Sequence, residues 1–151
     1  MGLQGGGKAL RHDMAWLAAT VMGLVAVAIA SFFGGYSPLH VAAMFAPKGV
    51  VAALVVAGLD TGAKSSNGNS PLHFAASWGR EDVVGLLLEK GADMHAIDRG
   101  GKTPLHLSTF SMSLDAAMDT LLAAGADKEK KDVHGKPYTV NPGHSALNPQ
   151  P

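Results

Sequence analysis

The stretch SPLHFAASWGREDVVGLLLEKGAD, residues 70–93, contains two short helical patterns separated by one glycine turn. Ser70 is a good N-cap, and Pro71 suits the first helical position because its missing N–H would have no partner there. The apolar spacing after Pro71 predicts one short helix, and VVGLLL at 83–88 predicts a second. Gly91 is free to take the left-handed conformation that ends a helix. The stretch therefore predicts a helix–turn–helix unit.

Near-copies of this unit recur along the chain. The motif begins at Ser37, Ser70 and Thr103, 33 residues apart, and each is followed by Pro-Leu-His. In the third copy the Gly-Ala-Asp stretch at 125–127 arrives one residue late, which places an extra residue near 111–113. Such short helices are marginal alone and are stabilised by stacking on their neighbours. The period therefore predicts a solenoid.

The motif resembles that of ankyrin repeats, which is T-P-L-H-x-A-A, a glycine turn, V-x-x-L-L and G-A-D. The first copy departs from it at the turn (46–49), and the third has Ser108-Thr109 in place of Ala-Ala. The resemblance covers about residues 35–138. It implies an all-α ankyrin-repeat solenoid with β-turn or hairpin loops, such as HAIDRGGK at 95–102.

An apolar run precedes the repeats. MAWLAATVMGLVAVAIASFF, residues 14–33, contains neither a charge nor a proline. A helix of about 20 residues crosses the roughly 30 Å hydrocarbon core of a bilayer, so we expect a transmembrane helix here. Two alternatives are a helix packed in a soluble domain or on a partner, and a secretory signal cleaved at Ala28-Ile29-Ala30.

These features predict an organisation and a location. Lys8 and Arg11 favour the N-terminus of a single-pass membrane protein on the positive-inside face, and an organellar membrane is one candidate. The expected parts are a polar N-terminal segment (1–13), the membrane helix (14–33), three repeats within 35–135 (37–69, 70–102 and 103–136), and a partial repeat with a proline-containing tail (137–151).

Composition and motifs narrow the function classes. Basic and acidic residues number 12 each, so no charge surplus points to nucleic acid. The chain has no cysteine, which excludes disulfides and thiolate metal sites. The sequence shows no Ser/His/Asp arrangement, no glycine-rich phosphate loop and no H-E-x-x-H. We expect no enzyme activity, no catalytic residue and no small-molecule substrate.

Three histidines at the same repeat position invite a metal hypothesis. His40, His73 and His106 belong to adjacent repeats, which stack at roughly the 8–10 Å of packed helices. That spacing is too wide for three ring nitrogens to share one ion, so we expect no metal site. The resemblance implies instead that this histidine is a structural hydrogen-bonding residue between repeats.

The resemblance also implies where partners bind, since ankyrin repeats hold proteins with their hairpin tips and with the residues before the inter-helix turn. The pre-turn candidates are Met44, Phe45, Ser77, Trp78, Phe110 and Ser111. The tip candidates are Ser66, Asn67, Asn69, Arg99, Lys102, Val133, His134 and Lys136. Because aromatic anchors dominate protein interfaces, we expect an interface role for Trp78; the alternative is that some of these side chains only pack against neighbouring repeats.

The first copy lacks the polar outer face of a terminal repeat. Its second helix, within GVVAALVVAGL at 49–59, has no charged residue, whereas the second copy has Glu81, Asp82, Glu89 and Lys90 there. Such an apolar face requires cover from the bilayer surface, the preceding helix or a partner subunit.

We therefore predict a non-catalytic, membrane-anchored ankyrin-repeat protein that binds other proteins. In this hypothesis residues 14–33 contact lipid, and the chain is an accessory or assembly subunit of a larger membrane complex, for which a photosynthetic or respiratory one is a candidate. One alternative is a soluble ankyrin adaptor or regulator whose N-terminal helix caps the first repeat. Another is a membrane subunit in which His12 ligates a pigment or haem, chlorophyll being the pigment considered; otherwise no cofactor is expected.

Overall fold

The computed structural model describes residues 35–109 and 116–138, together with residues 21, 23 and 25. Within this part of the chain the elements are helices, in the order α2 (Pro38–Phe45), α3 (Lys48–Val56), α4 (Pro71–Ser77), α5 (Glu81–Glu89), α6 (Pro104–Ser108) and α7 (Ala116–Ala123). Lys131 and Pro137 also form an isolated antiparallel β-bridge. The predicted all-helical class is confirmed for the described residues.

The apolar run contributes little to the described structure. Of residues 14–33, the predicted membrane helix, only Val21, Gly23 and Val25 are described, and all three have helical backbone. No helix formed by the described residues is both long enough and apolar enough to cross a membrane. The rest of the run lies outside the described residues.

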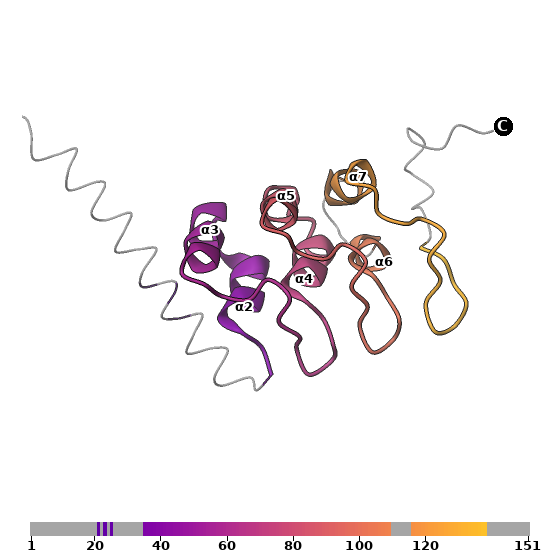
Figure 1. Cartoon of the computed structure of the whole chain (residues 1–151), viewed down its shortest axis with the longest axis horizontal. Coiled ribbons are helices and arrows are strands. Elements are labelled where there is room, and N and C mark those ends of the chain that lie inside the picture. Colours follow the sequence, from indigo (N-terminus) through magenta and orange to yellow (C-terminus); the bar gives the residue numbers. More distant parts are fainter. Residues whose placement is uncertain (1–20, 22, 24, 26–34, 110–115, 139–151) are drawn as a thin grey trace, which may run out of the picture.

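The helices stack in two layers. α2, α4 and α6 lie side by side in one layer, and α3, α5 and α7 lie side by side in the other (Figure 1). Each pair of consecutive helices, α2 with α3, α4 with α5 and α6 with α7, packs together as one repeat. Loops extend from one edge of the stack after each pair (Figure 1). This arrangement is the solenoid that the 33-residue period predicts.

The first helix of each pair begins as the sequence predicts. Ser37, Ser70 and Thr103 are N-caps in extended conformation, each followed by proline at the first turn. The third of these helices is the shortest. Ser108 and Thr109 donate their hydroxyls to the carbonyls three residues back, at 2.8 Å each. Such side-chain bonds compete with the helical ladder, and α6 ends at Ser108.

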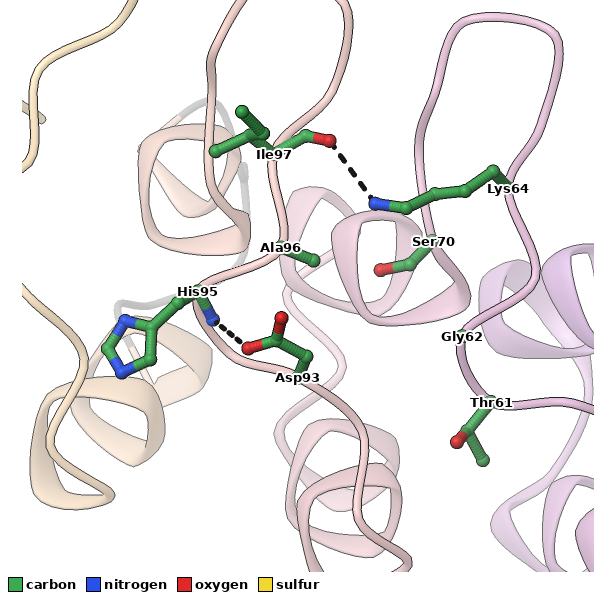
Figure 2. A pocket seen from close by; sticks show the side chains of 8 residues that line it. All are labelled: Thr61, Gly62, Lys64, Ser70, Asp93, His95, Ala96 and Ile97. Atoms are coloured by element: carbon green, nitrogen blue, oxygen red, sulfur yellow. Dashed lines mark hydrogen bonds between the residues drawn. The ribbon is translucent and has the colours of Figure 1, made fainter.

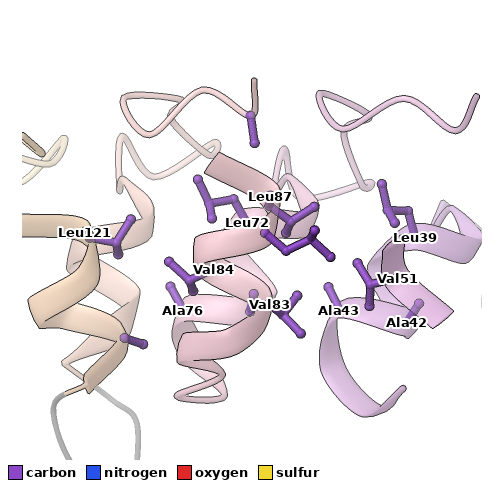
Figure 3. Packing of buried hydrophobic residues seen from close by; sticks show 14 of the residues in the cluster. Leu39, Ala42, Ala43, Val51, Leu72, Ala76, Val83, Val84, Leu87 and Leu121 are labelled. Carbon is purple, nitrogen blue, oxygen red and sulfur yellow. The ribbon is translucent and has the colours of Figure 1, made fainter. Parts of the chain in front are cut away.

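The core runs along the interface between the layers (Figure 3). Leu39, Leu72 and Leu105 occupy one repeat position and are 0%, 0% and 1% exposed. In the second layer, the buried pair Val83-Val84 corresponds to Ala117-Met118 of the third copy, 34 residues later. The extra residue therefore lies between α6 and the buried face of α7. Positions 111–113, where it was predicted, lie outside the described residues.

The loops are hairpins that hydrogen-bond to one another. Their arms are closed by Ser65 N–H donating to Asn69 O, Asp98 N–H to Lys102 O and Asp132 N–H to Lys136 O, at 2.9, 3.0 and 2.9 Å. Adjacent hairpins are joined by Arg99 N–H to Asn67 O and by Val133 N–H to Gly100 O, both 3.0 Å. The hairpin predicted at 95–102 is confirmed.

Glycine is required where adjacent hairpins touch. Gly101 has a φ of +70°, and a Cβ at this position would lie 2.9 Å from the backbone nitrogen of Val133. Any larger residue would be strained in its own backbone and would also push the next hairpin away.

Candidate protein-interaction site

Two pre-turn aromatic side chains from adjacent repeats form an exposed pair. Phe45 is the last residue of α2 and Trp78 is the C-cap of α4, one repeat period later. Their ring centroids lie 4.8 Å apart at an interplanar angle of 70°, an edge-to-face contact. Phe45 is nevertheless 59% exposed and Trp78 is 51% exposed. Contact between the two rings limits the rotamers of both side chains, while a large part of their apolar surface stays exposed to solvent.

Polar residues follow each of these rings in the chain. Exposed Lys48 begins α3, and Arg80 pairs with Asp82 at 3.7 Å between Nη2 and Oδ2. An exposed aromatic centre with charged groups beside it has the composition of a protein interface, in which the aromatic rings are desolvated and the rim stays wet.

The other pre-turn candidates are less accessible. Met44 is half-buried and packs with Tyr36 against the buried Val41. Ser77 is also half-buried, whereas Phe110 and Ser111 lie outside the described residues. Among the described pre-turn candidates, Phe45 and Trp78 are the ones that the fold brings together as an open surface.

Phe74 is an aromatic packing residue, partly exposed, that the sequence analysis did not single out. Its ring centroid lies 5.6 Å from that of Tyr36 and 5.6 Å from that of His40, so it joins the first two repeats. Val41, Phe74 and Leu107 occupy the same position of successive first helices. This apolar recurrence at the repeat period was the signal available in the sequence.

The hairpin-tip candidates lie on one edge of the molecule. Ser66, Asn67 and Arg99 are exposed, and so are the candidates of the last hairpin, Val133, His134 and Lys136. Val133 is 64% exposed although its N–H is bonded to the preceding hairpin.

Asn69 and Lys102 differ from the other tip candidates because their side chains are only partly exposed. Their main-chain carbonyls accept hydrogen bonds from His40 and His73. They therefore position the hairpins as well as lining the edge.

Each of the three histidines connects the first helix of its repeat to the hairpin at the end of that repeat. Nδ1 of His40 accepts the N–H of Ser37 at 2.9 Å and lies 2.8 Å from the Ser37 hydroxyl. Because that N–H can only donate, Nδ1 carries no proton, and Nε2–H donates to Asn69 O at 2.9 Å. His73 and His106 repeat this pattern with Lys102 O at 3.0 Å and Lys136 O at 3.3 Å. The structural hydrogen-bonding role implied for this histidine is confirmed, but these bonds lie within the repeats bounded at 37–69, 70–102 and 103–136 rather than between them.

Burial keeps two of these rings neutral. Desolvation lowers the pKa of His73 to about 4, since the carbonyl of Lys102, which favours the protonated ring, compensates only in part. Desolvation likewise lowers the pKa of His40 from its ordinary value. A neutral ring is what the Nδ1 acceptor requires. Among the described residues, no group of three histidine or carboxylate side chains is arranged to hold a metal.

A shallow pocket of about 440 Å³ lies between the segments that lead from the second helices to the first two hairpins (Figure 2). Lys64 Nζ crosses it to donate to Ile97 O at 3.2 Å, and Asp93 accepts the N–H of His95 at 2.8 Å. Its two charged side chains, of Lys64 and Asp93, have opposite sign and are already hydrogen-bonded. The pocket thus has no charged group left to select a ligand, and the hydrogen bond across it joins two adjacent repeats.

The arrangement defines a class of protein: an array of stacked helix–turn–helix–hairpin units that presents an open edge and exposed aromatic rings. The family model of ankyrin repeats, in 3 copies, matches residues 19–98 and 39–132. The chain belongs to the ankyrin-repeat family, and the resemblance seen in the sequence is confirmed. Its role is therefore protein–protein interaction, and ankyrin repeats are generally non-catalytic. No curated protein matches the chain.

Proposed function

We propose that this chain is a membrane-anchored ankyrin-repeat protein that holds a protein partner as an accessory or assembly subunit of a larger membrane complex. The partner-binding part of the proposal rests on one observation, the exposed pair of Phe45 and Trp78. Two aromatic rings already in contact lose little side-chain entropy on binding, and they present the kind of anchor that dominates interface energetics.

The membrane anchor is proposed from the sequence of residues 14–33. A helix of twenty uncharged residues would be about 30 Å long, which would match the hydrocarbon core of a bilayer. Gly34 and Gly35 alone separate this run from Tyr36 and the first N-cap. An anchored run would therefore hold the repeats directly at the membrane surface.

The outer face of α3 supports assembly into a complex. Ala53 and Val56 are exposed on this helix and Ala57 directly after it, and Val56 is 78% exposed. Contiguous apolar surface of this kind marks sites that are covered by another molecule. A neighbouring subunit or the lipid surface would supply that cover.

Two experiments test the proposal. Alkaline carbonate washing of membranes should leave the chain in the pellet, and release into the wash would reject the anchor. Co-purification in mild detergent tests the partner site. Trp78→Ala should weaken the association by about 2 kcal/mol, roughly thirtyfold, whereas Ile97→Ala, which truncates a 50% exposed side chain on a different segment, should leave it unchanged. Equal retention of the partner by both variants would reject Trp78 as an anchor.

A second candidate function is favoured by the family match. The match to 19–98 begins inside the apolar run, so part of that run is similar to ankyrin-repeat sequence. In this alternative, residues 19–33 would form the last helix of a preceding repeat and would cover α3. The chain would then be a soluble adaptor or regulator. The carbonate wash separates the two candidates, because an adaptor would be released.

A further inference from the structure

The first hairpin carries a reactive pair of residues at its tip. Asn67 precedes Gly68 there, whereas Gly100 and His134 occupy the place of Asn67 in the second and third hairpins. Asn67 is exposed, and Gly68 has a φ of +80°. Asparagine is thermally labile, and a glycine after it has no side chain to keep its backbone nitrogen away from the asparagine amide. Asn67 and Gly68 are therefore placed for an intramolecular reaction.

The other three asparagines of the chain lack this arrangement. Asn141 and Asn148 each precede a proline, whose nitrogen carries no hydrogen to lose. Asn69 precedes Ser70, a buried residue whose N–H donates to a histidine ring of α4 at 3.1 Å. A reaction at Asn69 would therefore require the start of α4 to open, so Asn69 serves as an internal comparison for Asn67.

The hairpin that holds the pair has a weaker side-chain closure than the other two. Asp98 accepts two N–H groups of the second hairpin, and Asp132 accepts two of the third, all at 2.8–2.9 Å. At the corresponding position of the first hairpin, the hydroxyl of Ser65 accepts the N–H of Asn69 at 3.2 Å. Hydrogen bonds to a carboxylate are roughly twice as strong as those between neutral groups. We therefore expect the first hairpin to open more readily than the others.

Two main-chain hydrogen bonds meet at the reactive pair. The N–H of Gly68 donates to Ser65 O at 2.8 Å, and this bond holds the proton that a reaction at the nitrogen must remove. The carbonyl of Asn67 accepts the N–H of Arg99 at 3.0 Å, which joins the first hairpin to the second. A Cβ on Gly68 would lie 3.0 Å from the same nitrogen of Arg99. A change in the backbone at this point therefore acts directly on the junction of the two hairpins.

We propose that Asn67 is a site of spontaneous deamidation and that its isoaspartyl product separates the first hairpin from the second. When the hairpin opens and the nitrogen of Gly68 loses its proton, that nitrogen bonds to Cγ of Asn67 and the bond from Cγ to Nδ2 breaks. Ammonia leaves, and a succinimide ring remains. Water then adds to one of the two ring carbonyls and opens the ring to aspartate or isoaspartate. The reaction takes up water and releases ammonia, with no oxidation or reduction.

The two products differ in their effect on the backbone. Aspartate leaves the main chain unchanged, including the carbonyl of residue 67. Isoaspartate directs the chain through Cβ and Cγ, which inserts an additional carbon and turns the former acceptor of the Arg99 N–H into a carboxylate on a side branch. The bond of 2.9 Å from Ser65 N–H to Asn69 O, which closes this hairpin, depends on the original length of the tip. Isoaspartate therefore weakens the junction, whereas aspartate preserves it.

The site can be tested on the full chain in mild detergent, aged in mildly alkaline buffer. Mass-spectrometric peptide mapping follows the loss of each side-chain amide, and enzymatic methylation of isoaspartyl carboxylates identifies the rearranged product. We expect Asn67 to convert severalfold faster than Asn69, with isoaspartate among the products. Asn67→Gln should block conversion at this position, because the longer side chain would have to close a larger ring. Asn67 does not have a positive φ, so glutamine can adopt the same backbone.

Amide hydrogen exchange measures the effect on the junction. The N–H of Arg99, which is bonded to Asn67, should exchange severalfold faster in the aged chain. The N–H of Val133 makes the equivalent bond to Gly100 at the next junction and should keep its rate. The aged Asn67→Gln chain should keep both rates. Freshly prepared Asn67→Asp should also keep the rate at Arg99, because it carries the new charge without the additional backbone carbon.

The contrary outcomes are distinct. Equal conversion at Asn67 and Asn69, or no conversion at Asn67, would overturn the modification site. Conversion at Asn67 with an unchanged exchange rate at Arg99 would overturn the separation of the hairpins. Urea unfolding should speed conversion, because it breaks the bond from Gly68 N–H to Ser65 O. An equal rate in the folded and unfolded chains would overturn hairpin opening as the controlling step.

Discussion

The second helices of the first two repeats have similar backbones but differ in the polarity of their exposed side chains. α3 and α5 are each nine residues long and each is followed by a left-handed glycine. Where α5 exposes Glu89 and is followed by Lys90, α3 exposes Val56 and is followed by Ala57. Inside the stack, Leu87 is fully buried whereas its counterpart Leu54 is only half-buried. The difference follows from position in the stack, because among the described second helices α5 packs against both α3 and α7, whereas α3 packs against α5 alone.

The largest expected effect is on the free energy of unfolding, and it compares how fully α5 and α3 are packed in the stack. Leu87→Ala should lower the free energy of unfolding by about 3 kcal/mol, because it leaves a cavity among fully buried neighbours. Leu54→Ala should cost about 1 kcal/mol, because part of the side chain is already in water. Urea unfolding of the full chain measures both. Equal costs would contradict the comparison and would mean that Leu54 is covered.

The second prediction compares the histidines of the two repeats at low pH. The unfolded ring of His73 titrates near 6.5 and the folded ring at about 4, so the unfolded state binds more protons between these values. The stability that neutral His73 contributes is complete above pH 6.5 and is lost as the pH falls toward 4, by about 3 kcal/mol. His40, whose pKa is also lowered, should change in the same direction.

Unfolding free energies measured over that pH range test this expectation, and NMR titration of the imidazole Cε1–H signals assigns it to each ring. His73→Gln should remove the part of the pH dependence that belongs to the second repeat. A folded His73 that titrates at its ordinary value would contradict the prediction.

The helix ends provide the third and smaller effect. Gly58 and Gly91 have φ values of +95° and +85°, and a Cβ at either position would meet nothing within 4 Å. Alanine should therefore cost about 1 kcal/mol at each, from backbone strain alone. Thermal or urea unfolding of the two variants should give the same value. A larger loss of unfolding free energy at Gly58 would mean that the end of α3 makes an additional contact.

The smallest expected effect on stability comes from a surface substitution on α3, which tests partner association without changing the fold. Val56→Glu gives α3 the residue that α5 has at this position, and it should change the unfolding free energy by no more than about 0.5 kcal/mol. If the face is covered in the complex, the same change should reduce co-purification of the partner severalfold. Glu89→Val on α5 is the matched control, and it should leave the association unchanged.

The local structure could be predicted because each part has a local cause. The serine or threonine caps, the prolines after them and the left-handed glycines act within a few residues, so the helices and hairpins follow from the repeat. Phe45 and Trp78 were predicted as interface candidates from their positions. Their edge-to-face contact depends on the exact stacking of α2 on α4, which no local pattern specifies.

The histidine bonds have a consequence for synthesis on the ribosome. The acceptor for His40 lies 29 residues further along the chain, that for His73 lies 29 residues further, and that for His106 lies 30 residues further. The histidine of each repeat therefore has no carbonyl acceptor until the hairpin at the end of that repeat has been made. The hairpin at 132–136 serves as the closing element for the third repeat. Since synthesis runs from the N- to the C-terminus, the acceptor for His40 is available before that for His73, and that for His106 comes last.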